Sequence, residues 1–377
     1  MKVHEILKAL INVSEKGANI ARIIRSEASL LDLLVQEKKG DQKNERFVRD
    51  FKTLADVLVQ EVVRYDLKQQ FSGIGESIYG EESNKFTNTL GDSITVEIQD
   101  TSQQTQQILS EVLDENMEAA KILADVIHQD VNVDNDLQCI DKEINVKDIG
   151  VWIDPIDSTA QYIQGMVGVE SNDLVDEGLQ CVAVLIGVYD KTNGLPIVGV
   201  TNQPFYTLDS STWKGSITWG VCIGDLKLNS LPSSSLSSDQ SRSKTILISS
   251  SESQSVQDTL SSTYTVRHIA GAGYKLLSVC QSLADSYVLT KSSNYKWDCC
   301  GPHAILRSLG GGIVKYTQLH EYANNDYKDV NGLEQIRYNR PDDEHATGAN
   351  TWCNHGGIVA YRSSDMLENL VKLFKSH

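Results

Sequence analysis

The chain has 377 residues, of which 40% are hydrophobic and 23% charged, and its formal net charge is −17. This composition excludes disorder over the whole chain, and no run of apolar residues is long enough to predict a membrane span. The acidic balance also argues against nucleic acid and anionic membranes as partners, because both require clustered lysine and arginine. If the ligand is an anion, bound cations rather than net charge have to attract it.

The N-terminus and the cysteines both indicate a cytoplasmic protein. Charged residues interrupt the apolar pattern of the first 25 positions, so no signal peptide is predicted. The seven cysteines are scattered, odd in number and contain no CxxC pair. We therefore expect free thiols in a reducing compartment.

The first part of the chain is predicted to alternate between helices and strands. Apolar residues at helical spacing predict helices over 3–36, 52–68 and 103–129. Residues 70–83 are typical of a strand that runs into a loop. Apolar runs bounded by turn residues predict four further strands, over 150–157, 179–190, 195–205 and 216–224.

A serine-rich loop over 231–243 is the best candidate for a domain boundary, which would separate residues 1–230 from 244–377. In the second part we predict strands over 245–251, 264–270, 286–290, 311–317 and 356–363. The predicted helices cover 255–263, 273–282, 299–309 and 364–375. Since several strands are joined as hairpins, the pattern favours an α/β (α+β) fold with mixed sheets layered with helices over a single doubly wound parallel sheet.

The segment Asp154-Pro155-Ile156-Asp157-Ser158-Thr159 carries the clearest chemical signal. Pro155 excludes helical geometry at Asp154, so Asp154 should end a strand while Asp157 begins a turn or helix. Two carboxylates that converge around such a turn stay ionised only if cations lie between them. Ser158 and Thr159 would follow at a helix N-terminus, which suits a phosphate group. The alternative is that Asp157 only caps the helix.

Three other acidic positions could join this pair. Glu81 follows Gly80 after a predicted strand, Asp298 begins a predicted helix, and Asp56 lies in the second predicted helix. Taken singly, Glu81 could belong to an acidic loop, Asp298 could cap a helix and Asp56 could be a surface residue. Taken together, Glu81, Asp154, Asp157 and Asp298 offer hard oxygen ligands of the kind that magnesium prefers. Two such ions could hold the attacking and leaving oxygens of an in-line displacement.

The competing site types are less well supported. The sequence has no HExxH, Walker A or GxSxG motif. We interpret His303 as a hydrogen-bonded helix residue and the pair Cys299-Cys300 as packing residues.

The order of these motifs resembles a known superfamily. Gly80-Glu81-Glu82, then the 154–159 segment, then Trp297-Asp298 before a helix is typical of the lithium-inhibited, magnesium-dependent phosphomonoesterases. These include inositol monophosphatases, fructose-1,6-bisphosphatases, 3′(2′),5′-bisphosphate nucleotidases and inositol polyphosphate 1-phosphatases. The similarity is strongest to the last group and spans about residues 3 to 375. It is carried by KTLADVLVQE (52–61), WIDPIDSTAQYIQG (152–165), GLQCVAVLIGVYD (178–190), AGAGYKLLSV (270–279) and KWDCCGPHAILRSLGGGIV (296–314).

Two further features agree with that group. Ser158 stands where monophosphatases usually have glycine, and a long insertion separates Glu82 from Asp154. The resemblance implies a layered αβαβα fold.

The resemblance also implies two or three Mg²⁺ ions, with Li⁺ as an inhibitor. The first ion would be held by Glu81, Asp154 and the backbone carbonyl of Ile156. The second would be held by Asp154, Asp157 and Asp298.

The implied catalytic group is Thr159, which would help to activate the attacking water with Glu81 or Asp56 nearby. The substrate-binding residues implied are Asp157, Ser158, Thr159, Ser251, Gly271 and Lys275. Among these, the amides of Ser158 and Thr159 would bind the 1-phosphate, and Lys275 would reach a second phosphate. Where the family has Ser-Glu-Lys, this chain has Ser251-Glu252-Ser253, so that lysine is missing.

The function implied is hydrolysis of the 1-phosphate of inositol 1,4-bisphosphate and inositol 1,3,4-trisphosphate, within phosphatidylinositol signalling. The attack would be direct, by metal-activated water, without a phosphoenzyme. A 3′(2′),5′-bisphosphate nucleotidase would use the same metal cage, and a non-catalytic sensor of inositol phosphates would be expected to have lost ligands. We expect a cytoplasmic monomer whose partner is a small inositol polyphosphate, with neither nucleic acid nor membrane.

Overall fold

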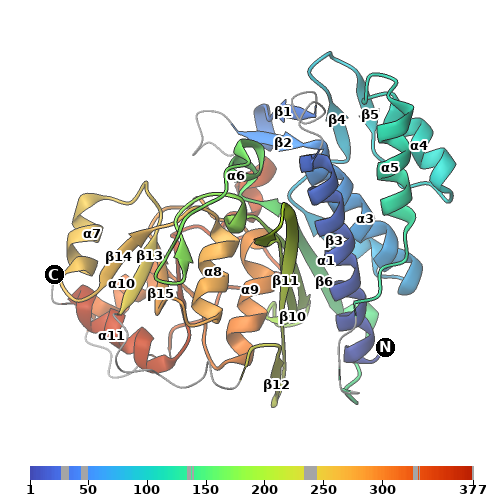
Figure 1. Cartoon of the computed structure of the whole chain (residues 1–377). Helices are drawn as coiled ribbons and strands as arrows, with labels where there is room; N and C mark the ends of the chain where they lie inside the picture. The colour runs from blue at the N-terminus through green and yellow to red at the C-terminus, as the bar shows by residue number, and fades with distance from the viewer. Residues whose placement is uncertain are drawn as a thin grey trace.

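The computed structural model describes residues 1–26, 34–43, 50–133, 137, 140–232, 244–325, 330 and 332–375. Five layers follow one another in the order αβαβα, as Figure 1 shows. The first layer contains α1 (Val3–Ser26) and α3 (Leu54–Gln70), and the central layer contains α8 (Ala272–Cys280) and α9 (Lys296–Ser308). The last layer is formed by α7 (Gln254–Ser261), α10 (Tyr316–Asn324) and α11 (Ser364–Lys375). The layered α/β fold that the resemblance implied is confirmed.

The first sheet has six strands, and all neighbours are antiparallel except β3 and β6, which are parallel. Their order across the sheet is β12 (Leu226–Asn229), β11 (Thr212–Ile223), β10 (Pro196–Asp209), β9 (Ala183–Asp190), β6 (Ile149–Asp157) and β3 (Ile78–Gly80). Along β6, Val151 and Ile153 pack towards α1 and α3 while Trp152 packs towards the central helices. This alternation is the two-residue period of a strand that is buried on both faces.

The second sheet has five strands of mixed direction. Its order is β14 (Thr265–His268), β13 (Thr245–Ile248), β15 (Ser286–Leu289), β17 (Ile358–Tyr361) and β16 (Gly312–Lys315). The first three are parallel, and β17 is antiparallel to both of its neighbours. Both sheets therefore match the mixed, helix-covered arrangement that the hairpin pattern predicted.

Three glycines let α9 lie very close to the first sheet. Gly187, Gly199 and Gly220 are cross-strand neighbours on β9, β10 and β11. A Cβ atom at Gly199 would lie 2.0 Å from the carbonyl oxygen of Gly301, and one at Gly187 would lie 2.4 Å from the backbone of Cys300. Since real Cβ atoms do not approach so closely, glycine is required here for α9 to pack against the sheet. This close packing sets the distance between the start of α9 and the end of β6.

Two predicted helices differ from the structure. Of the helix expected over 3–36, Val3–Ser26 is present as α1 and positions 27–33 lie outside the described residues. Val35–Glu37 forms strand β1, which pairs with β2 (Phe51–Thr53). The helix expected over 103–129 is two helices, α4 (Ser102–Ser110) and α5 (Met117–His128), which pack against each other. Between them Asp114 and Glu115 have φ angles of 51° and 56°, which reverse the chain.

The other predicted helices and strands are present, with boundaries shifted by a few residues. The helix expected after Asp157 is α6 (Thr159–Gln164). The structure adds elements that the sequence reading missed: α10, β12, and the pairs β4 (Lys85–Thr87) with β5 (Ser93–Thr95) and β7 (Glu170–Ser171) with β8 (Leu174–Val175). Most of the serine-rich loop lies outside the described residues. The division into 1–230 and 244–377 therefore stays a prediction.

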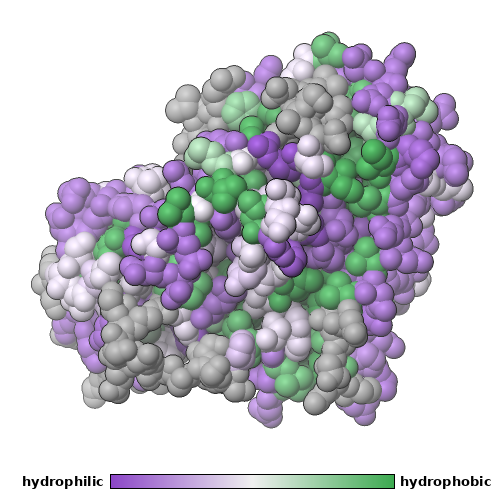
Figure 2. All heavy atoms as spheres, in the orientation of Figure 1, coloured by the Kyte–Doolittle hydropathy of each residue, from purple (hydrophilic) through white to green (hydrophobic). Residues whose placement is uncertain are grey.

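The surface is mostly polar on the face that Figure 2 shows, and hydrophobic residues form small, separate groups there. Within the described ranges, no helix has the length and apolarity that a membrane crossing demands.

Candidate active site

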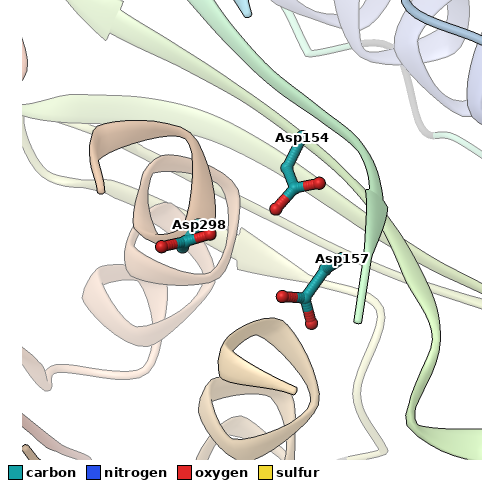
Figure 3. A group of neighbouring side chains, drawn as sticks. All are labelled: Asp154, Asp157 and Asp298. Carbon is teal, nitrogen blue, oxygen red and sulfur yellow. The ribbon is translucent and has the colours of Figure 1, made fainter. Parts of the chain in front are cut away.

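Asp154, Asp157 and Asp298 come together at the point where β6 ends and α9 begins. One carboxylate oxygen of each lies within 4.8 Å of the others, and all three side chains are buried (Figure 3). Residues three apart on a regular strand point to opposite faces. The pairing of β6 with β9 shifts register between Asp154 and Asp157, around Pro155. This irregularity explains how two aspartates at that spacing share one site.

Backbone donors hold two of these carboxylates. The N–H of Tyr295 donates to Asp298 Oδ2 at 2.6 Å, and the N–H of Gly273, at the start of α8, donates to Asp157 Oδ2 at 2.9 Å. The cluster is thus built by β6, α8 and α9, three elements that the fold fixes independently.

Burial raises the pKa values of all three aspartates. It raises the pKa of Asp154 well above its ordinary value, with Glu81, Asp157 and Asp298 adding to the rise. It raises the pKa of Asp298 to about 8, helped by the charge of Asp157. Burial also raises the pKa of Asp157 to about 6, although Lys275 and the N–H of Gly273 oppose this. Three mutually repelling carboxylates therefore need a cation to be fully ionised at neutral pH.

The donor set fits a small divalent cation. Asp154 Oδ1 is buried and has no hydrogen-bond partner within the described part of the chain, and the whole cluster consists of hard carboxylate oxygens. Magnesium prefers such ligands and keeps the rest of its shell for water and phosphate oxygens.

Glu81 lies beside this cluster but is already paired with a cation. Its N–H donates to the carbonyl of Ile153 at 3.2 Å, so it follows β3 next to the end of β6. Lys38 Nζ lies 2.6 Å from Glu81 Oε1 and 2.5 Å from Glu82 Oε1. The side-chain amide of Gln60 on α3 donates to the backbone carbonyl of Glu82 and accepts from the backbone N–H of the same residue. Sequence reasoning missed Lys38 and Gln60, since they are 43 and 22 positions away from their partners.

Asp56 and Thr159 contact each other next to this cluster. Thr159 Oγ1 lies 3.2 Å from Asp56 Oδ1 and 3.0 Å from the carbonyl oxygen of Ile156, so its proton is shared between these acceptors. Asp56 Oδ2 accepts from the N–H and the hydroxyl of Thr53, which caps α3. The interpretation of Asp56 as a surface residue is wrong, because it is fully buried. That burial raises its pKa to about 7.

A cavity of about 350 Å³ opens above these residues. It is lined by the cluster, by Glu81, and by Ser158, Thr159, Gly271 and Lys275, all of which were predicted to lie in the site. Its wall also contains Tyr287, Tyr295 and Trp297, which sequence reasoning did not identify.

Two positions in the cavity wall have backbones that favour glycine. At Gly271, with φ of +76°, a Cβ atom would lie 2.9 Å from the carbonyl oxygen of Cys181. Ser158 adopts the left-handed conformation with φ of 72°. Glycine reaches that conformation without strain, so a serine here is held in a backbone geometry that glycine would adopt more easily.

The contact predicted through Ser251 stays a prediction. Ser249 and Ser250 line the cavity, whereas Ser251 lies just beyond it. The reason is that β13 ends at Ile248 and the chain then turns away, so that Ser253 caps α7. Lys291, on the loop after β15, contacts the carbonyl oxygen of Ser251.

Lys275 lines the cavity but is almost fully buried, and its ammonium group is hydrogen-bonded to the backbone of the cavity wall. Its Nζ donates to the carbonyl oxygens of Ile269 and Gly271 at 2.8 and 2.7 Å. It also lies 5.1 Å from the centre of the Tyr287 ring.

The expectations for His303 and the two cysteines are confirmed. His303 is buried and hydrogen-bonded to Tyr338 and Gln335 at 3.0 and 2.7 Å. Burial raises the pKa values of Cys299 and Cys300 well above the ordinary value, which makes both thiols unreactive.

Comparison with known proteins gives a consistent set of relatives. The model of the inositol monophosphatase family matches residues 58–355. Inositol polyphosphate 1-phosphatase of Mus musculus is 44% identical over 97% of this chain and 96% of its own length, and that of Homo sapiens is 42% identical over 98% and 96%. The 3′(2′),5′-bisphosphate nucleotidase 1 of Dictyostelium discoideum is 31% identical, but over only 48% of this chain and 58% of its own.

Solved structures share the fold at low identity. The extragenic suppressor protein suhB from Bartonella henselae is 12% identical and covers 98% of both chains with a TM-score of 0.54. An IMPase from Thermotoga maritima is 10% identical and covers 99% of this chain and 97% of its own with a TM-score of 0.52.

Proposed function

Because the chain belongs to the inositol monophosphatase family, we propose that it is a phosphatase that removes the 1-phosphate from inositol 1,4-bisphosphate and inositol 1,3,4-trisphosphate. Relatives named inositol polyphosphate 1-phosphatase match nearly the whole chain at 42 to 44% identity. The observation that carries the chemistry is the cluster of Asp154, Asp157 and Asp298, three buried carboxylates that require a cation.

The residues that would hold magnesium are those of the cluster, with Glu81 and the carbonyl of Ile156 completing a second position. Two or three ions are proposed, with lithium as a competitor for one of them. Bound magnesium would polarise the phosphate, favour ionisation of the attacking water and neutralise the leaving oxygen.

Thr159 and Asp56 are proposed to handle the proton of the attacking water. In the hydrolysis, a bond forms between the water oxygen and phosphorus and the bond from phosphorus to the inositol oxygen breaks. The inositol oxygen takes up a proton from solvent water and leaves as a hydroxyl. The shared proton of Thr159 Oγ1 lets this hydroxyl accept from water while donating to Asp56. With a pKa of about 7, Asp56 can take up a proton at neutral pH.

The substrate is proposed to lie along the cavity. The amides of Ser158 and Thr159 would bind the 1-phosphate next to the cluster. Lys275 and Gly271, which line the same cavity, would contact the rest of the molecule, with Lys275 as the partner of a second phosphate. The monomeric state and the cytoplasmic location stay predictions.

A bisphosphate nucleotidase is the second candidate, and the cavity wall argues against it. A base would need an aromatic face to stack on, and one face each of Tyr295 and Trp297 is already taken, because these rings are stacked on each other at 4.7 Å. Trp297 also contacts Trp152, with ring centres 6.0 Å apart, and Lys275 covers Tyr287. A non-catalytic sensor is disfavoured because the acidic positions and Thr159 are all present.

A phosphate-release assay with magnesium tests the proposal. The substrates are inositol 1-phosphate, inositol 1,4-bisphosphate, inositol 1,3,4-trisphosphate and adenosine 3′,5′-bisphosphate, with Asp157→Asn as the control for contaminating phosphatase. We expect the two inositol polyphosphates to be hydrolysed with the highest kcat/KM and the control to be inactive. Preference for the nucleotide, or release that survives in the control, would contradict it.

A further inference from the structure

A completely buried lysine stands at the start of α9, two positions before Asp298. Lys296 has no exposed surface. Its Nζ donates to Asp342 Oδ1 and to Asn354 Oδ1, both at 2.8 Å. The ring centre of Tyr338 lies 5.9 Å from the same ammonium group. All of these partners come from the segment between β16 and β17, far along the chain from α9.

This is an unfavourable place for a lysine. The N-terminus of a helix carries partial positive charge and disfavours cations, and burial removes the water that would solvate the ammonium group. Buried ion pairs are often matched or exceeded in stability by apolar residues of similar volume. The network around Lys296 therefore calls for an explanation other than stability.

The side chain of Asn354 links this network to the metal cluster. Its Oδ1 accepts from Lys296, which fixes the orientation of the amide. Its Nδ2 then donates to the carbonyl oxygen of Tyr295 at 3.0 Å and to Asn294 Oδ1 at 2.8 Å. The N–H of the same Tyr295 holds Asp298 Oδ2 at 2.6 Å. A continuous chain of contacts thus runs from Asp342 through Lys296, Asn354 and Tyr295 to the carboxylate.

We propose that Lys296 and Asn354 are positioning residues that hold the turn before α9, and through it Asp298, in the geometry needed to bind a divalent cation. This inference rests on the proposed metal-dependent function and adds two residues that never touch the ion or the substrate. Hydrogen-bonded partners outside the ligand set orient metal ligands, and their loss typically weakens metal binding by roughly 10- to 100-fold. Since Lys296 acts through two further residues, we expect a loss near the lower end, of about tenfold.

The chain offers a matched control in Lys315. Its Nζ pairs with the other oxygen of the same carboxylate, Asp342 Oδ2, at 3.0 Å, but from a partly exposed position at the end of β16. Lys296→Met and Lys315→Met each remove one lysine from Asp342 and leave the other in place. Only Lys296 leads on to Asn354 and Tyr295, so the two variants separate positioning of Asp298 from support of Asp342.

The experiment measures Mn²⁺ binding without turnover, by titrating Mn²⁺ and following the free ion by electron paramagnetic resonance. The expected result is affinity about tenfold weaker in Lys296→Met and unchanged in Lys315→Met. Asn354→Leu breaks the same chain of contacts at its next member and should show a similar loss. In the double variant Lys296→Met/Asn354→Leu the two losses should not add, as for residues that act as a unit.

Other results would overturn the inference. Affinity in Lys296→Met within twofold of Lys315→Met would show that the network does not position Asp298. If the loss of Mn²⁺ affinity is proportional to the decrease in melting temperature across all the variants, the role of these residues is merely structural. If Lys296→Met does not fold, Asn354→Leu decides the question. Failure of the unmodified chain to bind Mn²⁺, or equal binding by Asp298→Asn, would instead contradict the proposed metal site itself.

Discussion

The two sides of the site neutralise their acidic residues in different ways. On one side Glu81 and Glu82 share the ammonium group of Lys38, at 2.6 and 2.5 Å. On the other side Asp154, Asp157 and Asp298 converge within 4.8 Å, and none of them forms an ion pair with another described residue. The glutamate side has its own cation, whereas the aspartate side depends on one from solution.

This difference predicts an order of metal binding. An ion at the three aspartates finds ligands that form no ion pair with a described lysine or arginine, although the charge of Lys275 acts on Asp157. An ion that uses Glu81 has to share that carboxylate with Lys38 or draw it away. We therefore expect the aspartate side to bind a divalent cation first and more tightly.

Removing one aspartate should have the largest effect. In Asp157→Asn or Asp298→Asn the side-chain volume is kept and one ligand charge is lost. Since even the outer partners of metal ligands are worth roughly 10- to 100-fold, we expect turnover to fall by more than about 100-fold. Phosphate release at saturating Mg²⁺ measures this, with circular dichroism as the control for folding. A folded variant with a near-normal rate would contradict the idea that the aspartate side needs a cation from solution.

The second prediction concerns the substrate rather than the metal. Lys275→Ala should raise KM for inositol 1,4-bisphosphate by about tenfold, as expected for the loss of a charged phosphate partner. Inositol 1-phosphate lacks the second phosphate, so its KM should change much less. The measurement is KM and kcat for both substrates, and Lys291→Ala, outside the cavity lining, is the matched control. Equal effects on the two substrates would refute the role of Lys275.

Sequence patterns predicted those parts of the site that depend on local rules. The spacing of Asp154 and Asp157 around a proline indicated a turn, and the position of Asp298 indicated a helix start. Lys38 gave no such signal, because its contact with Glu81 exists only after β1 and β2 pair and bring that segment beside β3. No pattern in the sequence marks the exact end of β13, on which the position of Ser251 relative to the cavity depends, because that end is set by its neighbours in the sheet. For the fold, periodicity predicted most elements, but neither the end of α1 nor the break between α4 and α5 follows from hydrophobic spacing.

The third prediction tests the glutamate side. Lys38→Met should let a cation use Glu81 without competition, and we expect Mn²⁺ to bind a few-fold more tightly at that side. Without added metal the variant should melt at a lower temperature, because among the described residues the buried Glu82 then keeps only Lys52, whose Nζ is 3.8 Å away.

Lys39→Met serves as the control, since this neighbouring lysine is exposed. Binding and melting are measured as for the other variants. Weaker Mn²⁺ binding in Lys38→Met, with Lys39→Met unchanged, would show that Lys38 supports the metal site instead of competing with it.

The smallest expected effect is a change in the pH dependence of stability, to which the aspartate side contributes. Its carboxyl pKa values are raised in the folded protein, to about 6 for Asp157 and about 8 for Asp298, above an unfolded value near 4. Between these limits the folded cluster binds more protons than it does in the unfolded chain, so its contribution to stability falls as pH rises from about 4 to about 8. Asp56, whose pKa burial raises to about 7, adds to this fall, whereas His303, whose pKa burial lowers to about 3, opposes it below about pH 6.5. With excess EDTA, the melting temperature should therefore be a few degrees higher at pH 5.5 than at pH 8. Saturating Mg²⁺ should reverse this trend, because the ion binds the ionised carboxylates and displaces their protons.

Asp298→Asn lacks the carboxyl group whose pKa is raised to about 8, so its melting profile in EDTA should be flatter between pH 6 and 8. A profile in EDTA that rises with pH, or that is the same in Asp298→Asn, would mean that the three aspartates do not share the strained, cation-requiring cluster on which the comparison depends.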